Sequence, residues 1–483
     1  MTAVAAVAAP ARPRVAAFLA ERGMGASVLV AGLSTAFGVI LLSTTGYLSA
    51  LLRAVFGTDG GTLTVMIAIL SVIFMIIAMY VGAIVTANTF STIVAGRTRR
   101  IALMRLIGAS AHTQRTEVAR QGLVVGLIGA AVGVLAGIAL SYGGVALAEA
   151  LLDVPDASFT VVQAWLALPA IAVVLTTWAA AWTGSRRVLT VTPLQALGGS
   201  VERTADQARG GTGRNIGAIS LLVFGGALLG FGVVLGLMTP LAIVISFIGG
   251  LISFTGLVLG ATLVMPPALR LVGRAFGRSA TARMAAENAL RYPERSSRMA
   301  IGVVVGVTLV TMFAVAAESA KAVMIANSGG AMDDDFAAVL DLFAGIMMGL
   351  VAVSAVIAAV GLVNLLTIGV VQRRTELGLL RALGLSNPQV RRMVLLEAAH
   401  ITITAVVVGL VLGIGYGWAG AQSLLGSIST SFGAPAGALV APAVPWAPMV
   451  VIVAATAILT LVASVGPTRL ATRVAPVEAL AAE

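Results

Sequence analysis

The sequence predicts an all-α polytopic membrane protein, because it is very apolar, poor in charge and divided into long hydrophobic runs. Of its 483 residues, 59% are hydrophobic and only 10% are charged, whereas soluble domains carry about 25% charged residues. A membrane-spanning helix needs about 20 apolar residues to cross the hydrocarbon core. Ten runs reach that length, at residues 24–52, 62–94, 121–147, 162–183, 216–237, 241–265, 299–318, 336–371, 394–421 and 444–465.

The charges of the loops predict the orientation. Every second loop is rich in arginine, whereas the loops between them hold Arg53 and Lys321 as their only basic residues. Positive charge accumulates on the cytoplasmic side of membrane proteins. We therefore expect both termini in the cytosol, and the net charge of +11 calls for no nucleic-acid partner.

A duplication divides the ten runs into four, two and four. Several residues of the first four runs recur 276 positions later, and the tail after the fourth run recurs 283 positions later. The pairs are Arg105 with Arg381, Gly108 with Gly384, Gly133 with Gly409, Gly137 with Gly413, and Pro193 with Pro476. The halves begin six runs apart, so they cross the membrane in the same sense. We expect two parallel pseudo-repeats related by an axis along the membrane normal.

This organisation predicts six segments. They are a cytosolic N-terminal tail with an interfacial helix (1–23), the first four-helix half (24–197), a cytosolic linker (198–215), a two-helix linker (216–265), a cytosolic amphipathic segment (266–298) and the second four-helix half (299–483). The chain has no cysteine, and His112 and His400 lie far apart. We therefore expect neither disulfides nor a metal site.

Two arginine-rich stretches, 97–120 and 373–392, each lie between long apolar runs and carry the repeated glycines, Gly108 and Gly384, which suit a helix end or sharp turn. Residues 372–384 read QRRTELGLLRALG, and the tails after the fourth and tenth runs read RVLTVTPLQAL and RVAPVEAL. Together these motifs resemble the FtsX-like permease family of ABC transporters. Many members of that family carry a large extracellular domain, whereas the outer loops here are short.

The resemblance implies that each arginine-rich stretch is a coupling helix, which docks on a separate cytosolic ABC ATPase. Arg100 stands where the second stretch has Glu376, so the two docking sites differ in charge there. Two stretches imply two ATPase copies per chain. The residues given the coupling role are Arg97, Arg100, Arg105, Gly108, Arg373, Arg374, Glu376, Gly378, Arg381 and Gly384.

The chain has no phosphate-binding loop of the Gly-x-x-x-x-Gly-Lys-Ser/Thr type. We therefore expect a non-catalytic subunit that binds no cofactor itself, with ATP and Mg bound by the partner ATPase. The expected function is export or extraction of a hydrophobic or amphipathic compound, such as an antimicrobial peptide, drug or lipid, at the inner membrane of a bacterium. The alternative is mechanotransmission, in which the permease regulates a cell-wall enzyme or sensor without transport. Membrane lipids are further expected partners, and an extracellular or lipoprotein partner is left open.

Few polar side chains fall inside the apolar runs, and those that stand out are Asn88, Asn364 and Glu397, the last with His400 near it. Ionisable groups inside a membrane are functional candidates. The plainer interpretation is interhelical hydrogen bonding for the asparagines and pairing with nearby arginines, Arg374, Arg391 or Arg392, for the glutamate. The repeated glycine pairs favour close helix packing, with a substrate groove as the less favoured alternative.

Overall fold

The structure is a computed structural model that describes most of the predicted helices. The described residues are 24–56, scattered positions between 69 and 87, 103–104, 106–151, 159–185, 212–275, 280–291, 293–327, 379, 381–427, 437 and 439–473. All regular structure within these ranges is helical, as predicted. The helices are α2 (Met24–Phe56), α5 (Ala111–Leu151), η1 (Ala164–Leu166), α6 (Ala167–Gly184), α9 (Thr212–Leu235), α10 (Ala242–Leu259), α11 (Ala261–Gly273), α12 (Ala280–Arg291), α13 (Pro293–Asn327), α16 (Asn387–Leu425) and α17 (Trp446–Arg473).

Seven of these helices are long and apolar enough to cross a membrane. They are Ser27–Tyr47, Ala111–Leu147, Ala164–Gly184, Gly213–Leu235, Ala242–Leu259, Ser296–Ala326 and Asn387–Leu425. A shorter apolar helix, Trp446–Ile458, coincides with the tenth predicted run. The run 336–371 lies outside the described residues, as does most of 62–94. The total of ten spans and their 4+2+4 division therefore stay predictions.

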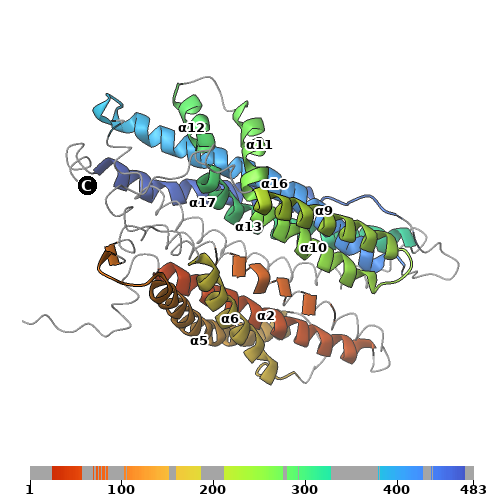
Figure 1. Cartoon of the computed structure of the whole chain (residues 1–483). Helices are drawn as coiled ribbons and strands as arrows, with labels where there is room; N and C mark the ends of the chain where they lie inside the picture. The colour runs from red at the N-terminus through yellow and green to blue at the C-terminus, as the bar shows by residue number, and fades with distance from the viewer. Residues whose placement is uncertain are drawn as a thin grey trace, which may run out of the picture.

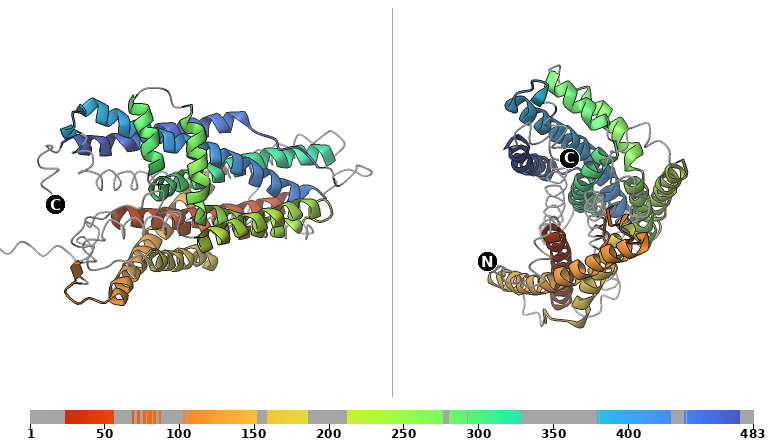
Figure 2. Two further views of the ribbon diagram at one scale, coloured as in Figure 1. Left: turned by 45° about the horizontal axis from the view of Figure 1, so that its top comes forward. Right: turned by 60° about the vertical axis from the view of Figure 1, so that its left-hand side comes forward.

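The described helices form two bundles that lie side by side (Figure 1). One contains α2, α5 and α6 of the first half, and the other contains α13, α16 and α17 of the second half. The α9–α10 hairpin packs along α16. Helices α11 and α12, which follow α10 and precede α13 in the sequence, cross the second bundle instead of running along it (Figure 2).

Each bundle is built on one closely packed helix pair, α2 with α5 and α13 with α16. A Cβ placed on Gly133 of α5 would lie only 2.6 Å from the Cβ of Thr35, and one on Gly409 of α16 would lie 2.8 Å from the Cβ of Val307. Real Cβ atoms do not approach so closely, so both positions need glycine. The sequence prediction of close glycine packing is confirmed at equivalent positions of the two halves.

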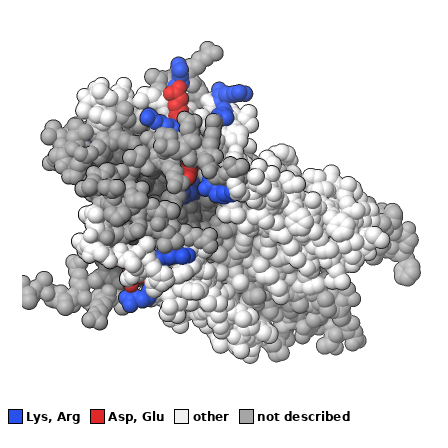
Figure 3. Space-filling model, viewed as in Figure 1, with Lys and Arg blue, Asp and Glu red and all other residues white. Residues whose placement is uncertain are grey.

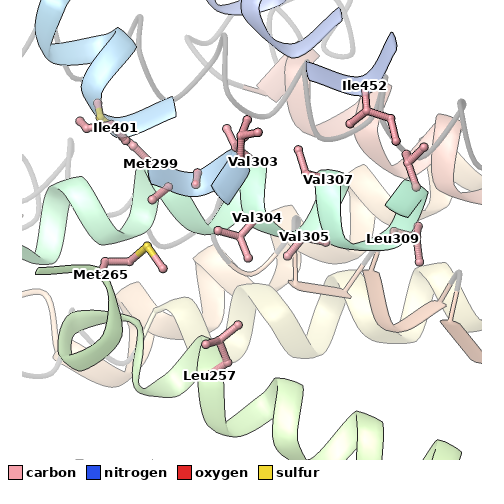
Figure 4. Packing of buried hydrophobic residues seen from close by; sticks show 14 of the residues in the cluster. Leu257, Met265, Met299, Val303, Val304, Val305, Val307, Leu309, Ile401 and Ile452 are labelled. Atoms are coloured by element: carbon pink, nitrogen blue, oxygen red, sulfur yellow. The ribbon is translucent and has the colours of Figure 1, made fainter. Parts of the chain in front are cut away.

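The main hydrophobic core joins the two halves. Val30 and Val81 of the first half belong to the same buried cluster as Leu257 of α10, Val304 of α13 and Ile401 of α16. Figure 4 shows α10, α11, α13 and α16 contributing side chains to this core, with Ile452 of α17 at one side. The halves are therefore packed together through the linker and not only tethered by it.

Helix α10 bridges the halves through hydroxyl groups as well as apolar packing. The hydroxyls of Tyr80, from the second predicted run, and Thr255 lie 2.7 Å apart, and those of Ser253 and Tyr416 on α16 also lie 2.7 Å apart. The Phe254 ring packs edge-on against both tyrosine rings, with centroids 6.2 Å apart in each case. Residues two apart on a helix point to different sides, so α10 holds one half on each side. The sequence analysis did not identify these residues.

The glycine packing predicts how Gly413 responds to substitution. A Cβ on Gly413 would overlap Thr311, whereas one on Gly415 meets nothing within 4 Å. Overpacking of a tight contact costs about 1–3 kcal/mol, so Gly413→Ala is expected to lower the free energy of unfolding by about that much. Gly415→Ala on the same helix is the matched control and should be neutral or slightly stabilising. Unfolding by sodium dodecyl sulfate in mixed micelles measures both, and equal effects would contradict the packing.

Candidate functional site

The two repeated glycines form matching backbone turns. Gly108 has a φ of 102° and Gly384 a φ of 103°, values that side-chain-bearing residues rarely adopt. A Cβ at either position would meet nothing within 4 Å, so it is the backbone angle and not crowding that requires glycine. The prediction of a helix end or sharp turn at both glycines is confirmed.

Backbone hydrogen bonds show the same order of structural elements at each turn. A short helix ends, with the Ile107 N–H donating to the Leu103 carbonyl at 3.2 Å and the Leu383 N–H donating to the Leu379 carbonyl at 2.9 Å. One residue follows each glycine, and then a serine begins the long helix. Ser110 Oγ accepts the Thr113 N–H at 3.0 Å.

The second turn has the reciprocal half of a capping box. The Ser386 N–H donates to Gln389 Oε1 at 2.9 Å, which satisfies one backbone donor at the start of α16. The glycine turns divide the two arginine-rich stretches, 97–120 and 373–392. Their second parts, Ala111–Arg120 and Asn387–Arg392, belong to α5 and α16.

Helices α5 and α16 are longer than a bilayer requires. They contain 41 and 39 residues, which at 1.5 Å per residue gives lengths of about 60 Å. The hydrocarbon core is only about 30 Å thick. Both turns therefore lie at the ends of helices that project beyond the membrane. Charged side chains gather at this end of the molecule on the face drawn in Figure 3.

An exposed aliphatic residue precedes each glycine. Ile107 is 80% exposed and Leu383 is 72% exposed, and they occupy equivalent positions of the repeat. Leu103 and Leu379, one turn earlier, are also equivalent and exposed. Single exposed apolar residues are common, but a matched pair at two equivalent turns makes these residues candidates for a contact surface. The sequence motif contains them, although its charges and glycines gave the stronger signal.

The second turn is braced by α12. Ala285 of α12 packs with Val390, Met393 and Val394 of α16 in a small buried cluster, and Leu385 packs against it. Leu385 follows Gly384 directly. The projecting start of α16 is thus held by apolar packing outside the predicted span.

Two buried polar contacts continue this brace along α16. Asn288 Nδ2 donates to Glu397 Oε2 at 2.7 Å, and His400 Nε2 lies 2.8 Å from the Leu269 carbonyl oxygen. Glu397 is thus placed against an amide of α12, a partner that the sequence analysis had not considered for it. Both contacts tie the α11–α12 segment to α16.

The first turn has a different support. The guanidinium of Arg115 lies over the Trp182 ring, with its carbon 3.8 Å from the ring centroid. The same side chain donates to the Trp182 carbonyl at 3.4 Å. This cation–π contact fastens the start of α5 to the end of α6. The two turns match at their tips but are anchored by different chemistry.

The structure places only part of the predicted site. Gly108, Gly384 and Arg381 lie at the two turns, and Glu397 lies on α16. The other predicted residues lie outside the described residues, so their placement stays a prediction. They are Arg97, Arg100, Arg105, Arg373, Arg374, Glu376, Gly378, Asn88 and Asn364.

Comparison with known families matches both turns. The model of the FtsX-like permease C-terminal region matches residues 72–193 and 348–476, together more than half of the chain. The chain belongs to the FtsX-like permease family. The two matches begin 276 residues apart (348 minus 72) and end 283 apart (476 minus 193), which are the offsets of the predicted duplication. Each FtsX-like match contains one glycine turn and the long helix that follows it.

One relative adds to this family match. The ABC transporter permease YtrF of Bacillus subtilis (strain 168) is 39% identical over 70 residues. The similar stretch covers 14% of this chain and 16% of YtrF. It therefore supports the family and leaves most of both chains uncompared.

The backbone of the turn predicts the effect of Gly384→Ala. A side chain at this φ costs on the order of 1–3 kcal/mol, with no steric overlap to add to it. We expect faster hydrogen exchange at the first turn of α16 and an intact transmembrane bundle. Gly415→Ala, at a glycine of α16 without a positive φ where a Cβ also meets nothing within 4 Å, is the control for the added methyl group alone. Unchanged exchange in Gly384→Ala would contradict a turn that depends on this backbone angle.

Proposed function

We propose that the chain is the membrane subunit of an ATP-driven ABC transporter, and that its two glycine turns are the docking sites of a cytosolic ATPase. The observation that carries this proposal is the matched pair of exposed residues, Ile107 and Leu383, at the projecting ends of α5 and α16. Family membership supports the same conclusion. ATP and Mg would be bound by the partner, and this chain would be non-catalytic.

The repeat supports two docking sites in each chain. An exposed aliphatic side chain that fits an apolar socket on the partner contributes about 1.5–3 kcal/mol when it is fully buried. Because both turns present such a residue, two copies of one ATPase could be bound in the same way. The difference between Arg100 and Glu376 in the sequence would then alter the charged rim of the contact and leave its apolar centre unchanged.

The helix packing supplies a route for movement. Helices α5 and α16 each begin just after a glycine turn and continue as one helix across the membrane. A displacement of either turn would therefore act on the first residues of one of these helices. The close glycine contacts would carry the displacement to α2 and α13. The bridge through α10 would then oppose independent movement of the halves. ATP-driven closure of the partner is thus expected to move both bundles together.

The work done by this movement is proposed to be export or extraction of a hydrophobic or amphipathic compound at a bacterial inner membrane. The shortness of the outer loops in the sequence supports handling of the substrate within or beside the bilayer. The alternative is a mechanotransmitting permease that regulates a sensor or cell-wall enzyme. Reconstitution with the ATPase in proteoliposomes separates them, because only a transporter should hydrolyse ATP faster when its substrate is added and move that substrate across the vesicle membrane.

The docking proposal predicts that Leu383→Asp and Ile107→Asp weaken binding of the ATPase. Loss of a buried aliphatic contact corresponds to about tenfold weaker binding or more. The measurement is the amount of ATPase that co-purifies with the tagged chain from native membranes, identified by mass spectrometry. Leu271→Asp is the matched control, since Leu271 is an equally exposed aliphatic residue, at the end of α11.

Charge reversal at Arg381, or at Glu376, is expected to uncouple or detach the ATPase in the same assay while the permease stays folded. A permease that elutes as before in gel filtration and unfolds as before would confirm that the fold is intact. Unchanged co-purification and unchanged ATP hydrolysis in the aspartate and charge-reversal variants would overturn the assignment of the docking sites.

A further inference from the structure

The end of the second half opposite the glycine turns carries an exposed apolar surface. It consists of the turn between α9 and α10, residues 236–241, of Gly437 and of residues 439–446, the last of which, Trp446, begins α17; we call these residues the outer ledge. Met238 is 81% exposed, Leu439 is 65% exposed and Trp446 is 77% exposed. The two pieces of the ledge touch, since a Cβ on Gly437 would lie 3.3 Å from the Leu237 carbonyl oxygen.

The outer ledge is free of charge over a long stretch of sequence. No Asp, Glu, Lys or Arg occurs between Arg214 and Arg270, or between Glu397 and Arg469. By contrast, the sequence that follows α5 in the first half contains Asp153 and Asp156. Loops that face water usually carry charged and polar side chains. An exposed surface without them is suited to an apolar environment.

The backbone of the outer ledge is hydrogen-bonded by side chains of the helices beneath it. Trp418 Nε1 donates to the Val440 carbonyl at 2.6 Å, and the Val440 N–H donates to Gln422 Oε1 at 3.2 Å. The Ala443 N–H donates to Ser319 Oγ at 3.1 Å. Gln422 itself is fully buried, so this amide is used inside the protein to satisfy an irregular segment.

Three further residues of the ledge have no backbone N–H left without a partner. The Gly437 N–H donates to the Gly426 carbonyl at 3.0 Å, and Pro442 and Pro445 have no N–H to satisfy. Irregular backbone is tolerated at membrane depth only where the protein satisfies its polar groups, because each unsatisfied group costs several kcal/mol in hydrocarbon. A loop in water has no such requirement.

We propose that the outer ledge lies within the outer leaflet and binds lipid acyl chains through Met238, Leu439 and Trp446. Apolar exposed side chains, absence of charge and backbone groups that hydrogen-bond to side chains of the helices together fit a lipid surface and not an aqueous one. The indole of Trp446, the first residue of α17, is suited to the boundary between hydrocarbon and headgroups, where tryptophan is enriched. The irregular segment before α17 thus contacts lipid.

The attachment of the ledge gives this contact a consequence for the transport cycle. Trp418 and Gln422 belong to α16, whose first residue lies three positions after Gly384. A displacement of the second turn would therefore move the ledge within the leaflet. This consequence rests on the proposed function, whereas the lipid contact itself does not.

Site-directed spin labelling tests the lipid contact directly. Because the chain has no cysteine, Leu439→Cys and Met238→Cys each carry a single nitroxide label. The full-length chain is reconstituted alone in phosphatidylcholine vesicles. Power-saturation spectra then compare collisions of the label with oxygen, which dissolves in hydrocarbon, and with a water-soluble nickel chelate.

Two reference positions calibrate the measurement. Val223→Cys, exposed on the apolar α9, is the lipid reference, and His112→Cys, exposed beside the first glycine turn, is the water reference. Labels at positions 439 and 238 are expected to lose nickel collisions to the level found at position 223. Nickel collisions at the level of position 112 at both ledge positions would overturn the proposal. Since no ATPase is present, neither outcome depends on the docking sites.

Discussion

The close approach of two helix pairs is the constraint on which the rest of the structure depends. Gly133 and Gly137 on α5 lie against α2, and Gly409 and Gly413 on α16 lie against α13. In a membrane, helices gain little from the hydrophobic effect, so small residues that permit close backbone contact supply much of the association. The projecting turns can act on the bundles only because α5 and α16 are each fixed to a neighbour in this way.

The duplication is strict at the centre of these contacts and relaxed at their ends. In the first half, the packing extends toward the glycine turn through Gly129, whose counterpart in the second half is Ala405. In the second half it extends away from the glycine turn through Gly417, whose counterpart is Ser141. The supports of the two turns differ as well, a cation–π contact in one half and the α12 brace in the other. The two halves therefore have similar glycine turns that are held in place by different contacts.

Sequence reasoning reached the parts of the protein that depend on composition and periodicity. The helical class, seven apolar spans, the glycine packing and the positive-φ turns follow from hydrophobic length, small-residue spacing and repetition of a motif. It did not place the start of α5 and α16 directly after the turns, because serine caps within an arginine-rich stretch gave a weaker signal than the charges around them. It also missed Tyr80 and Tyr416, and it did not identify the partner of His400, because these contacts join residues that lie far apart in sequence, on helices that no local pattern brings together.

The bridge through α10 also constrains how the protein can be assembled in the membrane. Helices α2, α5 and α6 can pack on one another as soon as the first half has been inserted, since the contacts among these three helices lie within that half. The contact between Tyr80 and Thr255 can form only after α10 has been inserted, and the contact between Ser253 and Tyr416 only after α16 has been inserted. Until then the Ser253 hydroxyl has only its hydrogen bond to the Gly250 carbonyl within α10. The interface between the halves is thus completed only after α16 has been inserted.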